Sequence, residues 1–354
     1  MTDANNLRTN VAELCGIRHV FLNQPLPAMA GPELVAAVSE AGGLGVVPAL
    51  SMSPEQITTF CARVRELTSR PFAIALDVDE TPVRVEGTEE LFATLAPLLE
   101  ELGLPLNAEQ DQDNVYDLRP THTYQERFAA ALAAKPNAVI AMFDGFREPE
   151  AEALQAAGVV NMAYFTSVLE AKVLHSAGCQ VLIAQGADAS GPRVSFGGAR
   201  YAGASLLTLV PAAIEATKLP VIALGGIYCR SQVAALRALG AAGIMVGTAL
   251  LPTEESAAQE LYRYWALHGQ MHDTILATTY HGINGCRMLK NSFTDWVWRG
   301  EPIGRVVYQR IFAAIEQAAR RCGRRDLLVY ELGLGIGRSA FERVADAVEN
   351  LSES

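Results

Sequence analysis

The sequence predicts an α/β protein: a TIM (β/α)8 barrel with an inserted, mainly helical cap after strand eight. Three observations predict this fold. Eight short apolar runs occur along the chain, and segments of helical periodicity separate them. Parallel strands joined by crossover helices give this pattern. The last two runs each end in glycine, as at the phosphate-holding rim of such barrels.

The eight runs have the length and composition of strands that are buried on both faces of a sheet. They lie at His19–Leu22, Leu44–Val47, Phe72–Leu76, Ala138–Met142, Val159–Phe165, Val181–Gln185, Pro220–Leu224 and Gly243–Val246.

Local signals delimit the crossover helices. The first helix is expected to begin at Gly31-Pro32 and to end at Gly42-Gly43, because proline suits the first turn and glycine ends helices. The last crossover helix is expected to take Ser231 as its N-cap and to end at Gly240.

Two segments interrupt the strand–helix alternation. An acidic, polar stretch runs from Asp77 to about Lys135 and contains helical patterns at Glu89–Leu102 and Tyr124–Ala134. The second stretch, Pro252 to about Arg325, contains three tryptophans and three helical patterns, and no strand is expected in it. The sequence therefore predicts a barrel domain at 1–252 and 326–354, and a helical cap or substrate domain at 253–325.

Composition limits the classes of function. Half of the 354 residues are hydrophobic and 19% are charged, so a large core can form. The net charge of −11 opposes a nucleic-acid partner. The six cysteines show no C-x-x-C pair, and neither a signal peptide nor a membrane-spanning run is found. We expect a cytoplasmic enzyme with a small-molecule substrate and no membrane partner.

The glycines after the last two runs predict an anion site. Val221–Leu224 leads into Gly225-Gly226, and the next run leads into Gly247-Thr248. Backbone amides at such strand ends, with the threonine hydroxyl, form a nest for a phosphate group without a lysine. The alternative is an ordinary crossover in which the glycines serve packing alone.

Several further motifs occur in a fixed order along nearly the whole chain. They are Pro27–Gly45, Thr166–Val168, Ala184–Gly191, Gly225–Ile227, Gly247-Thr248 and Thr253–Ser256. Through them the chain resembles the nitronate monooxygenase (2-nitropropane dioxygenase) family of FMN-dependent barrels, which is related to the flavin enoyl-ACP reductases.

The resemblance implies FMN as cofactor and gives a role to each matched position. Ala28, Met29 and Ala30 would lie along the flavin ring, and Gln185 would hydrogen-bond to it. The 5′-phosphate would be held by Gly225, Gly226, Val246, Gly247 and Thr248. The simpler alternative for Met29 is core packing.

The chain departs from the family pattern at the expected catalytic base. The family has a histidine that takes the α-proton of a nitroalkane at the position of Pro192, and proline has no titratable group. Ala75 replaces a common asparagine, and Asp188 replaces a glutamate. The candidate replacements for the base are Asp144, Tyr164, His281 and Tyr330, and each is also consistent with a structural polar role.

The best-supported function is FMN-dependent oxidation of a nitronate or related organic substrate, with O2 or NAD(P)H as the electron partner. A nitronate is already an anion, so its oxidation needs no base. The alternatives are an FMN-dependent enoyl reductase or dehydrogenase in a biosynthetic pathway, and a non-catalytic flavin-binding protein.

Three remaining features have competing interpretations. His268 and His272 have helical spacing, but no third ligand is evident, so no metal site is predicted. The glycines from Gly333 to Gly337 have the wrong spacing for a Rossmann site, and by resemblance they form a return loop near the flavin. Arg193 is expected either to bind an anionic substrate or to form a surface ion pair.

Overall fold

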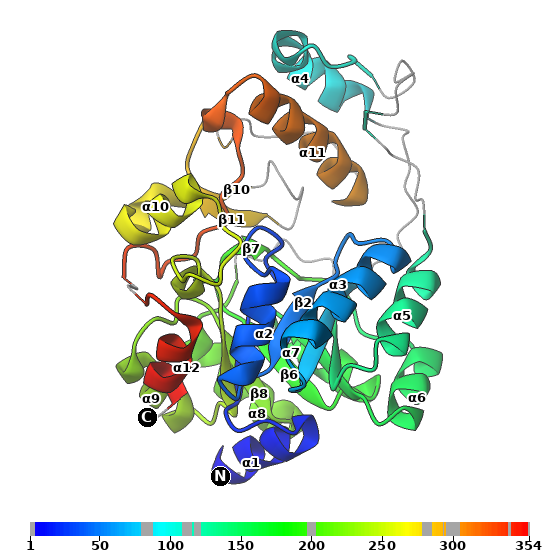
Figure 1. Ribbon diagram of the computed structural model, residues 1–354, viewed down its shortest axis with the longest axis vertical. Helices are drawn as coiled ribbons and strands as arrows, with labels where there is room; N and C mark the ends of the chain where they lie inside the picture. The colour runs from blue at the N-terminus through cyan, green and yellow to red at the C-terminus, as the bar shows by residue number, and fades with distance from the viewer. Residues whose placement is uncertain are drawn as a thin grey trace.

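The computed structural model describes residues 4–78, 88–107, 115–116, 122–196, 203–277, 285–292, 294, 305–338 and 341–352. Figure 1 shows a barrel body, with both termini at its lower end, and a smaller upper part formed around α4 (Glu89–Leu102) and α11 (Arg305–Arg321). None of the helices in these residues is long and apolar enough to cross a membrane.

Eight parallel strands form the barrel, as predicted. They are β1 (Phe21–Asn23), β2 (Gly45–Pro48), β3 (Phe72–Asp77), β4 (Ala138–Met142), β5 (Val160–Phe165), β6 (Val181–Gln185), β8 (Val221–Leu224) and β9 (Gly243–Val246). Their order in the sheet is β1-β9-β8-β6-β5-β4-β3-β2. The ends of each strand agree with those of its predicted run to within two residues.

The seam between β1 and β2 closes the barrel. Leu44 N donates to Phe21 O at 2.9 Å, but farther along the seam a side chain takes the place of a backbone ladder. The Asn23 amide accepts from Val46 N at 2.7 Å and donates to Val46 O at 3.0 Å. Because Asn23 is fully buried, these two bonds satisfy backbone groups that water cannot reach.

Helices cover the outside of the barrel, and their ends follow local capping chemistry. α2 (Pro32–Glu40) begins after Gly31 with proline in its first turn, as predicted. α3 (Pro54–Leu67) and α7 (Val168–Ser176) have serine capping boxes. The other helices of this layer are α5 (Tyr124–Ala133), α6 (Glu148–Ala156), α8 (Leu206–Thr217), α9 (Arg230–Ala238) and α12 (Val344–Ser352), and α1 (Ala4–Cys15) precedes β1.

One capping prediction was wrong. The N-cap of α9 is Cys229 and not Ser231, because Gln232 bonds back to the Cys229 amide and Ser231 is already inside the helix. The predicted end of this helix is confirmed, since Gly240 follows it with φ +98°.

Two apolar layers stabilise the barrel. The inner layer fills the barrel itself and includes Ile140, Met162, Ile183 and Met245, while the outer layer lies between strands and helices. The predicted barrel is therefore a packed core, and its chemistry belongs to the loops at the strand ends.

The cap is built from two separate insertions. α4 comes from the segment between β3 and β4, as its predicted helical pattern indicated, and it packs against α11, which follows β9. Figure 1 shows the two helices side by side above the barrel. α10 (Glu260–His268) also belongs to the second insertion. The boundary at 252/253 stays a prediction.

A small sheet connects the cap to the barrel. β10 (Thr274–Ala277) and β11 (Cys286–Leu289) form a hairpin, and β7 (Gly191–Pro192) pairs with β11 as a third strand. The expectation that residues 252–325 contain no strand was wrong, because these four-residue strands are too short to interrupt a helical pattern in the sequence.

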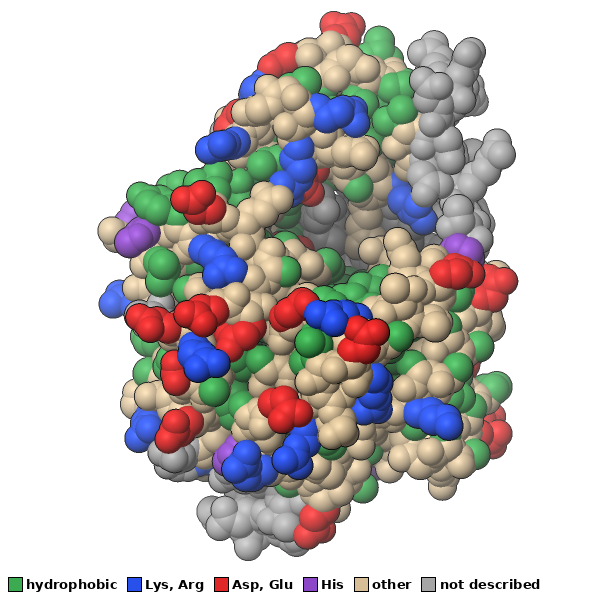
Figure 2. All heavy atoms as spheres, viewed as in Figure 1, with side chains coloured by type: hydrophobic (Ala, Val, Ile, Leu, Met, Phe, Trp, Pro, Cys, Tyr) green, Lys and Arg blue, Asp and Glu red, His purple; other side chains and the backbone are tan. Residues whose placement is uncertain are grey.

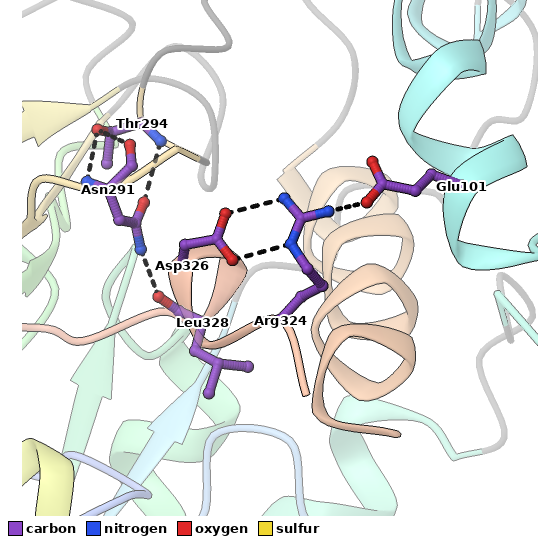
Figure 3. Close-up of polar contacts among 6 residues, drawn as sticks. All are labelled: Glu101, Asn291, Thr294, Arg324, Asp326 and Leu328. Carbon is purple, nitrogen blue, oxygen red and sulfur yellow. Dashed lines mark hydrogen bonds and ion pairs between the residues drawn. The ribbon is translucent and has the colours of Figure 1, made fainter. Parts of the chain in front are cut away.

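An arginine links the two insertions. Arg324 donates to Glu101 at the end of α4 and, at 2.8–2.9 Å, to both carboxylate oxygens of Asp326 in the 3₁₀ turn Arg325–Leu327. Figure 3 shows this arrangement beside Asn291, which donates to Leu328 O at 2.6 Å. In Figure 2 the surface is hollowed between α11 and the barrel.

Candidate functional site

The predicted glycines lie together at the carboxyl ends of β8 and β9. Gly225, Gly226, Gly247 and Thr248 line one pocket. The remaining lining residues come from other strand ends and from the C-terminal loop: Gln24, Ala189, Ser190, Leu224, Ile227, Met245 and Gly335. No Lys, Arg, Asp or Glu is among them, so backbone dipoles and neutral side chains form the pocket.

Close backbone packing explains why glycine is needed there. Gly225 and Gly226 have φ +141° and +65°, values that residues with a Cβ atom rarely adopt. A Cβ on Gly225 would lie 3.0 Å from Ala189 N, and one on Gly226 would lie 3.0 Å from Asp188 Cβ. The β6 and β8 loops therefore approach each other at a separation that a side chain would prevent.

The C-terminal loop forms another wall of the pocket. Gly333 N donates to Thr248 Oγ1 at 2.9 Å, and Leu334 N donates to Asp188 O at 3.0 Å. Gly335 lines the pocket. The glycine-rich return loop thus lies beside the predicted phosphate site, and its proximity to a flavin stays a prediction.

Gln24 and Ser190 complete the site, and sequence reasoning missed both. Ser190 Oγ donates to Gln24 Oε1 at 2.8 Å, and Gln24 Nε2 donates to Ser190 O at 2.9 Å. Both residues are at least 95% buried and line the pocket. Their signal in the sequence was position alone: each follows a strand whose carboxyl end lies at the functional rim.

The pocket fits a phosphate group. Glycines from two neighbouring strand ends line its walls. A Cβ on Gly247 would collide with the Gln24 side chain and occupy the space between these walls. Convergent amides at strand ends are the usual phosphate ligands of this barrel type.

Two residues assigned to the flavin ring have structural partners in the described chain. Met29 is fully buried in the outer core layer, while Ala28 is exposed. The Gln185 amide donates to Pro192 O at 2.8 Å and accepts from Val194 N at 3.1 Å. Gln185 therefore fixes the segment after β7, and contact of these residues with a flavin stays a prediction.

Arg193 does not form the surface ion pair that was one of its two expected roles, and the binding of an anionic substrate stays a prediction. It is 1% exposed, so it forms no surface pair, and its guanidinium donates to Gly186 O and Ala189 O, both at 2.6 Å. Burial, with the nearby Arg287 cation, lowers the pKa of Arg193 to about 10. Arg287 donates to Ala187 O at 2.9 Å. Arg193 and Arg287 together therefore bind backbone carbonyls of the turn after β6.

The candidate replacement bases do not form one cluster among the described residues. Asp144 is exposed, and its Oδ1 accepts from Gly145 N at 2.8 Å. Tyr164 lies inside the barrel and donates to Met245 Sδ at 2.8 Å, and burial raises its pKa well above the usual value. Tyr330 packs edge-on against Tyr262, with ring centroids 5.3 Å apart. His281 lies outside the described residues.

A different carboxylate lies beside the small sheet that contains Pro192. Glu331, directly after Tyr330, has Oε1 3.9 Å from Cys286 Sγ, and Cys286 pairs with Pro192 in the small sheet. Burial raises the pKa of Glu331 to about 7. Sequence reasoning missed this residue because the pairing of β7 with β11 brings together positions far apart in the chain.

The histidines give no cluster with metal-site geometry. His268 and His272 are both exposed, as is His175. Within the part of the chain that the structure describes, no three His, Cys, Asp or Glu side chains are grouped to hold a metal ion.

Comparison with known proteins gives one consistent result. The family model described as nitronate monooxygenase matches residues 8–353. A probable nitronate monooxygenase of Staphylococcus saprophyticus is 28% identical over 291 residues, covering 81% of this chain and 80% of the relative.

Solved structures agree with that result. The nitroalkane oxidase from Streptomyces ansochromogenes superposes with a TM-score of 0.84 at 26% identity, covering 96% of both chains. FabK from Thermotoga maritima has the same fold, with a TM-score of 0.69 at 21% identity and coverage of 97% of this chain and 94% of that one. Because the family model spans nearly the whole chain and the barrel carries the pocket that the family motifs predict, this protein belongs to the nitronate monooxygenase family of flavin-dependent oxidoreductases.

Proposed function

We propose that this protein binds FMN and oxidises nitronates, the anions of nitroalkanes. The observation that carries the proposal is the pocket in which Gly225-Gly226 and Gly247-Thr248 converge at the ends of β8 and β9. A pocket walled by amides and free of acidic side chains suits the dianionic 5′-phosphate of FMN.

The chain's own residues would hold the cofactor by its phosphate. Backbone amides of Gly226, Gly247 and Thr248 would contact the phosphate, and the Gln24–Ser190 pair would keep the pocket's other wall in place. When bound, FMN supplies an electron acceptor for the organic substrate and passes the electrons on to O2. Preformed loops reduce the conformational cost of binding.

A nitronate is the substrate form that needs least from the protein. Pro192 has no group that can accept a proton, and its carbonyl is occupied by the Gln185 amide. Removing a proton from a neutral nitroalkane requires a base, whereas a nitronate arrives without that proton. The likeness to a nitroalkane oxidase supports the same substrate class.

The proposal is tested by the visible spectrum and by anaerobic reduction. The purified protein should be yellow, or become so with added FMN, and heat should release FMN. Bleaching by ethyl nitronate and not by NADH or NADPH is the expected result. Bleaching by a pyridine nucleotide alone would favour an enoyl reductase or dehydrogenase. A protein that takes up no FMN would contradict the proposal outright.

A further inference from the structure

The Glu331 carboxylate lies at the junction of three segments that bound the site. Its Oε1 is 3.9 Å from Cys286 Sγ in β11. A Cβ built on Gly191 in β7 would lie 3.6 Å from Glu331 Oε2 and 3.6 Å from Gln24 Nε2. With Leu26 Cδ2 at 3.5 Å, this carboxylate and the amide of Gln24, which lines the pocket, therefore border the same side of Gly191.

The backbone around Glu331 is fixed. Tyr262 Oη donates to Glu331 O at 2.7 Å, and two residues farther along Gly333 is bonded to Thr248. The loop that carries the carboxylate is thus held at one end by the cap helix α10 and at the other by the pocket. This fixed position is what a group that exchanges a proton with a bound substrate requires.

The titratable and charged groups around Glu331 come from several elements. Cys286 on β11, Tyr262 on α10 and Glu316 on α11 interact with it, and the cations Arg193 and Arg287 act electrostatically on the Cys286 thiol. Burial raises the pKa of Glu331 to about 7, the Glu316 carboxylate raises it further, and the Cys286 hydrogen bond opposes the shift. Near neutral pH the carboxylate therefore exchanges protons readily, which is the optimum for a general base.

We propose that Glu331 is the base that deprotonates neutral nitroalkanes in this protein, in place of a side chain at Pro192. The α C–H bond of the nitroalkane breaks, its electron pair stays on the substrate as the nitronate anion, and the proton bonds to a carboxylate oxygen of Glu331. The proposal rests on the proposed function and extends it from nitronates to their conjugate acids.

Other candidates in the described chain are less suited to this role. Asp144 is exposed to water on the barrel surface. Tyr164 lies in the barrel interior, and its raised pKa keeps the hydroxyl protonated at neutral pH. Glu331 lies beside Cys286, the residue of β11 that pairs with Pro192, and beside Gly191.

A Glu331→Gln variant tests the proposal with two substrates. With nitroethane, kcat/KM is expected to fall by about 100-fold or more, the usual contribution of a general base. With ethyl nitronate it is expected to change less than about threefold, because that substrate needs no base. Glu331→Asp should recover part of the nitroethane activity, and Glu152→Gln, an exposed carboxylate on α6, is the matched control.

A second measurement follows the proton itself in the purified full-length protein. In ¹³C NMR of protein labelled at glutamate carboxyls, one resonance should titrate near pH 7 and be missing in Glu331→Gln. The wild-type kcat/KM for nitroethane should rise with pH through the same value, while that for ethyl nitronate should not follow it.

Different failures have different meanings. Wild-type protein that does not oxidise ethyl nitronate would contradict the proposed function. If nitronate oxidation is intact in wild type, unchanged nitroethane activity in Glu331→Gln would overturn the role of Glu331. Equal loss of both activities at normal flavin content would also overturn it, because a structural role would then explain the effect.

Discussion

At the scale of single residues, the pocket depends on glycines, which have no Cβ atom. Gly226 has φ +65°, and its missing Cβ leaves room for Asp188. Gly158 has almost the same φ, +68°, but a Cβ there would meet nothing within 4 Å. Comparing alanine substitutions at the two glycines therefore separates the effect of backbone strain from the effect of filling space at the pocket.

The Gly226→Ala substitution is expected to weaken FMN binding at least tenfold, because the β8 loop must shift away from Asp188. Gly158→Ala should leave the FMN dissociation constant unchanged. Both variants should lose about 1 kcal/mol of stability through left-handed backbone strain. Flavin fluorescence titration and urea unfolding measure the two effects. Equal FMN affinity in both variants would argue against the pocket as the phosphate site.

The raised pKa of Glu331 has a consequence for stability. The folded state holds this proton up to about pH 7, whereas the unfolded chain releases it near pH 4.5. The folded state binds more protons between these values, so the free energy of unfolding falls as pH rises through this window. Below the window the penalty is absent, and above pH 7 it is complete.

Glu331→Gln removes this penalty. The variant should match wild type at pH 4.5 and exceed it by roughly 1–3 kcal/mol at pH 8, as a shift of this size implies. Urea unfolding at the two pH values, without added ligand, provides the comparison. A stability difference that does not vary with pH would show that Glu331 titrates at its ordinary value.

At the scale of elements, the β1–β2 seam depends on one side chain. Asn23 alone supplies the partners of Val46 N and Val46 O there. Asn23→Leu should cost about 2–4 kcal/mol, because it leaves two buried backbone groups unsatisfied. Chemical denaturation measures the loss. Thr58→Val, which removes an exposed side-chain bond on α3, is the control and should cost under about 1 kcal/mol. A similar small loss for Asn23→Leu would mean that water enters the seam.

The strands were predictable because each is a buried parallel strand, and such strands appear in sequence as short apolar runs between helical segments. β7 was not predictable. Two residues, Gly191–Pro192, give no periodicity, and their assignment as a strand depends entirely on hydrogen bonding to β11 about 95 residues away. The same pairing places Pro192 opposite Cys286, whose thiol contacts Glu331, so the sequence identified a missing base without indicating the carboxylate near it.

At the scale of the whole molecule, the cap combines an insertion between β3 and β4 with a second insertion after β9. Glycine and threonine positions in the pocket were predictable because they lie at strand ends, whose common location the barrel topology dictates. The packing of α4 on α11 was not, because both helices are amphipathic and many partners satisfy an apolar face equally well.

Arg324→Ala is expected to loosen the cap without unfolding the protein. Its side chain is 33% exposed, so the pair with Glu101 should contribute under about 1 kcal/mol to global stability. Amide exchange in α4 should nevertheless become faster, because α4 loses an attachment to the second insertion. Arg63→Ala on α3, whose ion pairs are confined to the surface of the barrel helices, is the control. Unchanged exchange in α4 would show that apolar packing alone holds it.

The three-stranded sheet β10-β11-β7 couples the cap directly to the segment that follows β6 of the barrel. The third strand of this sheet, β7, belongs to the loop whose position is fixed by hydrogen bonds from Gln185 and Arg193. A cap exchanged for that of a relative, to alter substrate choice, keeps this sheet only if the incoming hairpin pairs with Gly191 and Pro192 in the same register. A cap graft should therefore include residues 191–194 together with the β10–β11 hairpin, so that both partners of the pairing come from one protein.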